Sequence, residues 1–91
     1  RERKQKMEDL SGAFIVSPGG IGTFEEFFEI LTLKQLGRTK KPLVILNTAG
    51  YYDDMLAMMR HTVESNFMSA QTFDLIGIVD TPEQAIDYIE H

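Results

Sequence analysis

Short apolar runs alternate with amphipathic stretches along this chain. Continuous apolar residues at 13–16, 43–46 and 75–79 are typical of strands that are buried on both faces of a sheet. Between these runs, residues 23–36 and 51–64 repeat their apolar positions every three to four residues, which indicates two helices. The pattern therefore predicts three buried strands joined by two helices.

The ends of the predicted elements carry their own signals. Residues 1–10 are polar except for Met7 and Leu10, which lie three apart, and this spacing predicts the end of a helix. Gly37 is a stop signal for the helix before it. Thr81 and Pro82 have the residue types of an N-cap and a first helical position, so a short terminal helix follows.

Strict alternation of helix and strand predicts the fold class. Such an order favours an α/β fold with a doubly wound parallel sheet, right-handed crossovers and helices on both faces. In sheets of this kind ligands bind beyond the carboxyl ends of the strands. We therefore look for functional residues just after the predicted strands.

Composition narrows the class of function. A chain of 91 residues holds one domain at most, and its net charge of −5 disfavours a nucleic-acid partner, which would need a basic face. The chain has no cysteine, which excludes disulfides and cysteine-based zinc sites and fits a reducing compartment. No apolar run approaches the ~20 residues of a membrane span, so we expect no membrane partner and a cytoplasmic location.

A glycine-rich segment, residues 17–23, joins the first predicted strand to the longest predicted helix. Gly19, Gly20 and Gly22 let the backbone approach a ligand closely, and the free N–H groups of a helix start favour an anion. Thr23 can cap the helix or donate its hydroxyl to a phosphate. The loop lacks both the P-loop lysine and a full dinucleotide fingerprint, so a monophosphate fits best. A glycine-rich turn without any ligand remains the alternative.

Three glutamates follow the loop, and their distances from its glycines suggest different roles for them. Glu25, Glu26 and Glu29 fall in the first turns of the predicted helix, where an acid stabilises the helix by about 0.3–1 kcal/mol. This stabilisation of the helix start is a sufficient explanation for the positions of Glu25 and Glu29. Glu26 lies four residues after Gly22, one turn along the helix, and so should lie close to the anion. There a carboxylate can act as a base toward water or stabilise positive charge on a sugar.

Arg3 and Lys4 can reach the same edge of the sheet. A five-residue strand spans about 16 Å, and a helix from Leu10 back to Arg3 spans about 10 Å. If that helix runs antiparallel to the strand, Arg3 returns to the edge with the glycine loop, where its planar fork suits phosphate or carboxylate. The alternative is a solvated run of charges over residues 1–6.

The sequence offers no metal site. His61 and His91 have no partner at ligand spacing, and Asp53-Asp54 falls where a helix opens, as helix-capping acids do. We therefore predict that the protein binds no metal.

These residues resemble the signature motifs of a known family. Arg3-Lys4, and Pro18-Gly19-Gly20-Ile21-Gly22-Thr23 continuing to Glu26, are similar to the Arg-Lys pair and the Pro-Gly-Gly-x-Gly-Thr-x-x-Glu loop of the Lonely Guy (LOG) family. The resemblance covers nearly the whole chain. Further matches are Met7, Leu33 to Gly37 (with Leu33 where tryptophan is common), Lys41-Pro42, Asn47, Gly50 to Asp53, and Phe67. Family members are longer, so we expect residues 1–91 to form a single Rossmann-like domain that is the carboxyl-terminal half of a longer one.

The resemblance implies an activity and a set of site residues. Members hydrolyse the N-glycosidic bond of a cytokinin riboside 5′-monophosphate or of AMP, and release the base and ribose 5-phosphate. By position, the catalytic pair is Arg3 and Glu26, the phosphate loop comprises Gly19, Gly20, Gly22 and Thr23, and Lys4 and Glu25 line the site. The family uses no metal and no cofactor, and it forms homodimers with the site near the interface. The Phe-rich helix over 23–36 fits such an interface.

Two alternatives from other classes stay open. The first is a non-catalytic nucleotide-binding or sensing module of the same fold, since a fold does not fix a function. The presence of both Arg3 and Glu26 favours the enzyme, because a binder needs the glycine loop but not that carboxylate. The second is a half-domain that acts only together with its missing half. Some related proteins are labelled lysine decarboxylases, but no lysine here has a recognisable pyridoxal-phosphate context.

Overall fold

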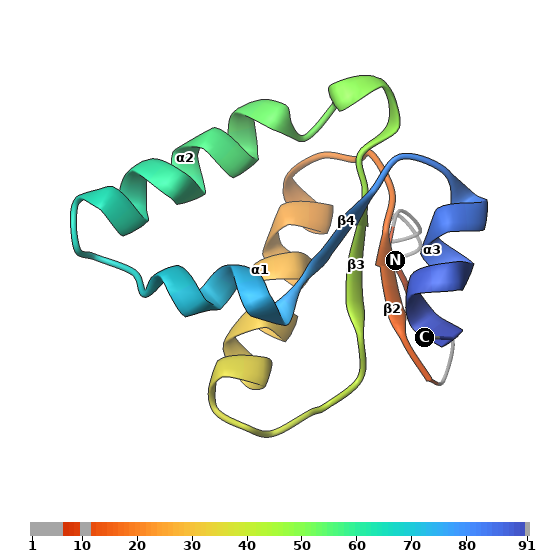
Figure 1. The fold of residues 1–91 in the computed structure, drawn as a ribbon, viewed down its shortest axis with the longest axis horizontal. Helices are drawn as coiled ribbons and strands as arrows, with labels where there is room; N and C mark the ends of the chain where they lie inside the picture. The colour runs from red at the N-terminus through yellow and green to blue at the C-terminus, as the bar shows by residue number, and fades with distance from the viewer. Residues whose placement is uncertain (1–6, 10–11, 91) are drawn as a thin grey trace.

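A four-stranded sheet forms the centre of the computed structural model, which describes residues 7–9 and 12–90 (Figure 1). The strands are neighbours in chain order: β1 (Met7–Asp9), β2 (Phe14–Val16), β3 (Leu43–Leu46) and β4 (Gly77–Val79). β2, β3 and β4 are parallel, with Val16 opposite Ile45 and Ile45 opposite Ile78. The predicted α/β class with a parallel sheet is confirmed, and it is compatible with a partial Rossmann-like domain.

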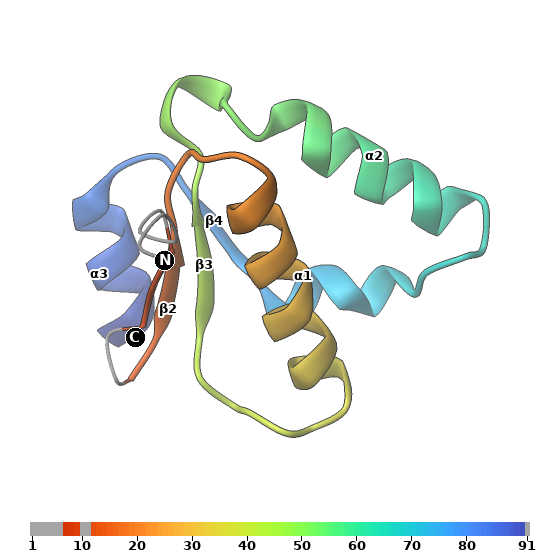
Figure 2. The same ribbon diagram turned by 180° about the vertical axis from the view of Figure 1, so that it is seen from behind.

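Helices cover both faces of the sheet, as the alternation predicts. α1 (Ile21–Gln35) and α2 (Asp53–Glu64) lie on one side, and α3 (Pro82–Glu90) lies on the other (Figures 1 and 2). Two short 3-10 helices, η2 (Thr48–Gly50) and η3 (Ala70–Leu75), lie in the connections. α1 and α2 share a face because each joins one parallel strand to the next strand in the same direction.

The first strand corrects one prediction. Residues 7–9 pair antiparallel with β2, so a helix over residues 1–10 is wrong for this part of the segment. With only Met7 and Leu10 apolar, the segment has no apolar stripe that could anchor a helix on the core. As a strand, residues 7–9 hydrogen-bond to the open edge of β2, and polar residues are well tolerated in such an edge position.

α1 begins two residues earlier than its periodicity predicts. Gly20 is its N-cap and no side chain caps it, so the expectation that Thr23 caps this helix is wrong. Thr23 instead lies inside the first turn and is buried. The stop signal is confirmed: Gly37 has a φ of 73°, and the Arg38 N–H donates to the Leu33 carbonyl over 2.8 Å.

The other element ends also follow local chemistry. Asp53 and Asp54 lie in the first turn of α2, where the helix was expected to open, but the N-cap is Tyr52 and no side chain caps it, so the predicted capping role is wrong. The Thr81 hydroxyl accepts a hydrogen bond from the Gln84 N–H over 3.1 Å, and Pro82 begins α3, which confirms the predicted cap. The predicted strand over 75–79 is shorter than expected, because Leu75 ends η3 and pairing with β3 begins at Gly77.

The core lies between the sheet and the helices on its α1 face. Its buried side chains come from all these elements: Val16, Phe27, Leu31, Leu43, Ile45, Tyr52, Leu56, Met59 and Ile76. Each such large side chain contributes about 1.5–3 kcal/mol by burial. The partly buried Phe24 and Phe28 pack against this cluster as well, so part of the apolar surface of α1 faces the core, whereas Ile21 at its start is exposed. None of the helices in the described ranges is long and apolar enough to cross a membrane.

Candidate functional site

The loops that follow the parallel strands meet at one edge of the sheet. Residues 17–20 follow β2, residues 47–52 follow β3, and residues 80–81 follow β4 (upper end in Figure 1). The Asn47 N–H donates to the Val79 carbonyl over 2.7 Å, which ties the second loop to the end of β4. This is the carboxyl edge at which ligands of doubly wound sheets bind.

The glycine loop ends at the start of α1, where the first backbone N–H groups have no intrahelical acceptor. The first helical hydrogen bond of α1 runs from the Phe24 N–H to the Gly20 carbonyl over 3.0 Å. The N–H groups of residues 21–23 therefore precede the intrahelical ladder, and Gly20, the N-cap, has no side chain with which to cap them. These groups and the helix dipole together favour an anion at this point.

The described part of the fold leaves space for a side chain at two glycines of the loop. A Cβ added to Gly20 or to Gly22 would meet nothing within 4 Å in the described part of the chain. Neither residue has a positive φ, but only Gly22 has the helical backbone that alanine adopts readily, because Gly20 has φ −115° and ψ −145°. The described fold therefore does not require glycine at position 22, where its absence of a side chain would let a ligand approach the backbone closely.

The structure describes some of the predicted site residues and not others. Gly20, Gly22 and Thr23 lie at the start of α1, although Thr23 is buried there. Glu26 is half-buried one turn beyond Gly22 on the same helix face, and helical side chains lean toward the N-terminus. Arg3 and Lys4 lie outside the described residues.

The explanation offered for the neighbouring acids needs correction. Because α1 begins at Ile21, its first turn holds no acidic residue. The dipole effect falls off within the first turn, so it does not account for Glu25 or Glu29. Both side chains are exposed, and Glu25 remains a candidate for lining the site only by resemblance.

Two tyrosines that the sequence analysis gave no role hold the glycine loop. The Tyr51 hydroxyl donates to the Gly19 carbonyl and the Tyr52 hydroxyl donates to the Ser17 carbonyl, each over 2.6 Å. Both come from the loop after β3. Burial raises the pKa of the Tyr52 phenol, and the neighbouring Tyr51 adds to the rise. The only sequence signal was the family match over Gly50 to Asp53.

Asn47 fixes the loop that carries these tyrosines. Its side-chain oxygen accepts from the Tyr52 N–H over 2.6 Å, and its amide nitrogen donates to the Asp53 carboxylate over 2.9 Å. Asn47 is itself buried. The carboxyl edge is therefore a connected hydrogen-bonded unit that runs from Asp53 through Asn47 and Tyr52 to the glycine loop.

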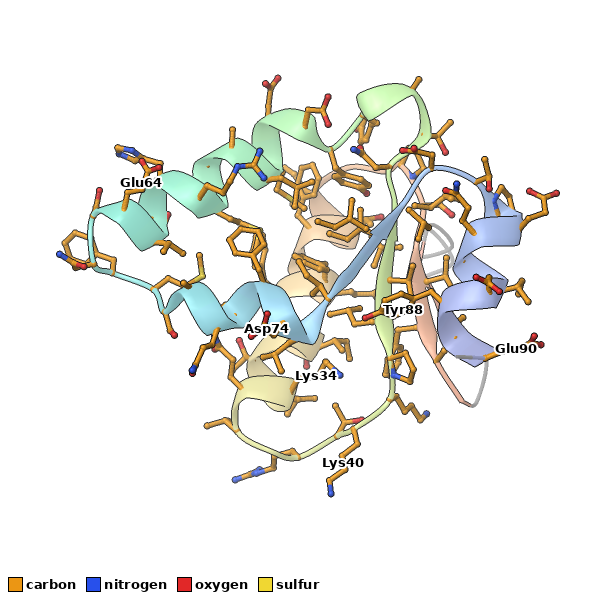
Figure 3. The ribbon with its side chains drawn as sticks, viewed as in Figure 1. Lys34, Lys40, Glu64, Asp74, Tyr88 and Glu90 are labelled. Carbon is orange, nitrogen blue, oxygen red and sulfur yellow. The ribbon has the colours of Figure 1, made fainter. Side chains whose placement is uncertain are left out.

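A separate cleft lies at the opposite, amino-terminal edge of the strands. It has a volume of about 530 Å³, and Figure 3 shows Lys34, Lys40, Asp74 and Tyr88 around it. The Lys34 ammonium donates to the Lys41 carbonyl over 2.6 Å, and burial lowers the pKa of Lys34. Among the described residues no three histidines or acids are grouped as a metal would require.

The fold and this edge define a class. A parallel α/β sheet whose first crossover runs through a glycine loop into a helix is compatible with a partial Rossmann-like domain, a fold whose glycine loops can hold anions. Comparison of sequences then names the family: residues 1–89 match the family described as "Possible lysine decarboxylase". The chain belongs to this family, which includes the LOG proteins.

The curated relatives carry a more specific name. The cytokinin riboside 5′-monophosphate phosphoribohydrolase of Rhodococcoides fascians is 41% identical over 85 residues, which are 93% of this chain and 43% of the relative. The protein of that name from Mycobacterium tuberculosis is 38% identical over 93% of the chain and 46% of its own length. LOG3 of Arabidopsis thaliana, named likewise, is 38% identical over 98% of the chain and 41% of its own length. The chain thus spans less than half the length of these relatives.

Proposed function

We propose that this chain carries the phosphate loop and a catalytic carboxylate of a nucleoside 5′-monophosphate phosphoribohydrolase. The reaction is hydrolysis of the N-glycosidic bond of a purine or cytokinin riboside 5′-monophosphate to the free base and ribose 5-phosphate. One observation carries the proposal: Glu26 follows the uncapped helix start by one turn, on the face that Gly22 leaves open. The names of the curated relatives support it independently.

The arrangement fits the charges that develop in this reaction. The 5′-phosphate binds the N–H groups at the start of α1 and keeps the ribose still. As the C1′–N bond breaks, electrons leave with the base and the sugar becomes oxocarbenium-like. The Glu26 carboxylate offsets that positive charge and takes a proton from the water that attacks C1′. The departing base takes up a proton from solvent and Glu26 releases the one that it took from water, so one water is consumed in total. By resemblance, Arg3 holds the substrate and Glu26 in place.

The geometry favours this reaction over a decarboxylation through a lysine Schiff base. Lys34 is a partly buried amine, but it lies thirteen residues beyond Ile21 on α1, which corresponds to about 20 Å along a helix. A phosphate anchored at the glycine loop and a cofactor linked to Lys34 would therefore occupy different sites. The phosphoribohydrolase reaction uses groups at the start of α1 and, by resemblance, Arg3.

The resemblance extends to assembly and location. We propose a homodimer and a cytoplasmic protein, with no cofactor. Sedimentation velocity of the purified full-length protein tests the dimer: a species of twice the monomer mass supports it, and a monomer at micromolar concentration contradicts it.

The activity is tested by following release of free base. The full-length protein is incubated with AMP and with isopentenyladenosine monophosphate, and the products are separated by chromatography. Glu26→Gln and Arg3→Ala should both abolish release. Glu29→Gln serves as the matched control, since it removes the same charge from an exposed position on the same helix and should keep the activity.

The outcomes separate the enzyme from a sensing module. Base release that is lost in Glu26→Gln and kept in Glu29→Gln supports the proposal, and the two substrates show the base preference. Nucleotide binding without release of base from either substrate overturns it and leaves the non-catalytic module.

A further inference from the structure

Two neighbouring tyrosine hydroxyls hold two different peptide groups of the glycine loop. Tyr51 reaches the Gly19 carbonyl and Tyr52 reaches the Ser17 carbonyl, across 32 and 35 positions of sequence. Both bonds are short, and both donors come from the single loop after β3. The two contacts nevertheless differ in what lies on the other side of each peptide.

A trans peptide presents its C=O and the following N–H in opposite directions. The bond from Tyr51 to the Gly19 carbonyl therefore turns the Gly20 N–H away from Tyr51. Gly20 is the N-cap of α1, directly before the free N–H groups of the first turn. An oriented Gly20 N–H adds one more donor at the anion site.

The second contact has no such consequence. The carbonyl held by Tyr52 belongs to the Ser17–Pro18 peptide, and proline has no N–H. Tyr52 therefore holds the beginning of the loop at the Ser17 carbonyl and also meets the Gly19 N–H, so the loop donor beside Tyr52 is already occupied by the phenol. The pair offers a natural control. Each tyrosine hydroxyl donates to a loop carbonyl, but only the peptide that Tyr51 holds has an N–H on its other side, that of Gly20.

The donors themselves are held in place. The Tyr52 N–H is bound to Asn47, and the rings of Tyr51 and Tyr52 pack edge to face with centroids 4.9 Å apart. The Tyr52 ring also meets Phe24 of α1 edge to face, at 6.3 Å. The position of the Tyr51 hydroxyl thus follows from packing against the buried neighbour as well as from its own bond.

We propose that Tyr51 is a positioning residue for phosphate binding, which acts by orienting the Gly20 N–H toward the anion. This inference rests on the proposed phosphate site. Tyr51 touches no reacting atom; it acts through the Gly19–Gly20 peptide. Its effect is on substrate affinity, because the phosphate lies away from the bond that breaks and is bound alike before and during the reaction.

The test compares Tyr51→Phe with Tyr52→Phe in the full-length protein. Titration calorimetry with ribose 5-phosphate gives Kd, urea denaturation gives stability, and kinetics with AMP give KM and kcat. For Tyr51→Phe we expect Kd and KM to rise about 2- to 10-fold, the equivalent of one neutral hydrogen bond, with kcat and stability unchanged. Tyr51 is 52% exposed, so loss of its hydroxyl leaves the core intact. For Tyr52→Phe, whose residue is 1% exposed, we expect lower stability and an unchanged Kd.

The possible results distinguish the proposed role of Tyr51 from the proposed phosphate site on which it rests. Weaker binding in Tyr51→Phe alone supports the inference. Equal binding by the wild type and Tyr51→Phe overturns it and leaves the proposed function intact. Equal weakening in both variants also overturns it, because the tyrosines would then hold the loop as a whole. A wild-type protein that does not bind ribose 5-phosphate removes the phosphate site, and both proposals fall.

Discussion

Replacing Gly22 by alanine should stabilise the protein and weaken its ligand binding at the same time. Gly22 lies inside the first turn of α1, where its backbone is helical and an added Cβ would meet no described neighbour within 4 Å. The substitution therefore introduces no clash within the described fold. It does place a methyl group beside the N–H groups that are proposed to bind phosphate.

The two effects have opposite signs and separate origins. Alanine is preferred over glycine in a helix by about 0.5–1 kcal/mol, which raises the melting temperature of a domain of this size by about 2–8 °C. Loss of one hydrogen bond to a charged phosphate costs about 1.5–3 kcal/mol, which weakens binding about tenfold to a hundredfold. A glycine that serves only as a connector would show the first effect without the second.

Urea denaturation and titration calorimetry with ribose 5-phosphate measure the two quantities on the same protein. Gly37→Ala is the matched control, because Gly37 ends the same helix with a φ of 73° that alanine adopts only under strain. That variant should lose stability and keep its affinity. If Gly22→Ala bound ribose 5-phosphate as tightly as the wild type, the argument from open space at this glycine would be refuted.

Three further predictions concern the core and the carboxyl edge. Phe27→Ala, which empties a fully buried position, should cost about 3–5 kcal/mol in urea denaturation, a large part of the stability of a small domain. Asn47→Ala leaves the buried Tyr52 N–H without its acceptor and should cost about 1–3 kcal/mol by the same measurement; Asn47→Asp keeps that acceptor but sets a second carboxylate against Asp53, so it should lower stability as well. The raised pKa of Tyr52 means that its neutral phenol favours the folded state; this stability is complete below the ordinary pKa of 10.0 and is lost as pH rises through the higher folded value. The urea midpoint should therefore fall as pH rises above about 10 in the wild type, and Tyr52→Phe should flatten this fall.

Local chemistry made much of the fold predictable from sequence. The run of four apolar residues after Pro42 coincides with β3, because a strand buried on both faces needs an uninterrupted apolar sequence. Gly37 and the Thr81-Pro82 pair mark helix ends through their own backbone and side-chain hydrogen bonds. Signals of this kind lie within a few residues of the feature that they predict.

Features that depend on distant partners were missed or misplaced. Residues 7–9 form a strand because the edge of β2 offers backbone partners, and nothing in their own sequence indicates this. The start of α1 was placed at Thr23 because glycines weaken the helical pattern before it, although the helix begins at Ile21. The contacts of Tyr51 and Tyr52 with the glycine loop join segments more than thirty residues apart, so no local sequence pattern predicts these contacts.

The candidate site was recognised through its motif more than through periodicity. The loop glycines and Glu26 have the spacing that places them on one end of one helix, and the structure places them there. The pairing of Glu26 with Arg3 comes from the family resemblance, since Arg3 lies outside the described residues. A direct test of this catalytic pair therefore needs a structure that describes both segments of the site.

A crystal structure of the full-length protein with bound ribose 5-phosphate would test the central claim most directly. We expect the phosphate oxygens within hydrogen-bond distance of the N–H groups of Gly20, Ile21 and Gly22, and the sugar C1 beside the Glu26 carboxylate. A phosphate bound instead in the cleft between Lys34 and Lys40, with the glycine loop empty, would contradict the account.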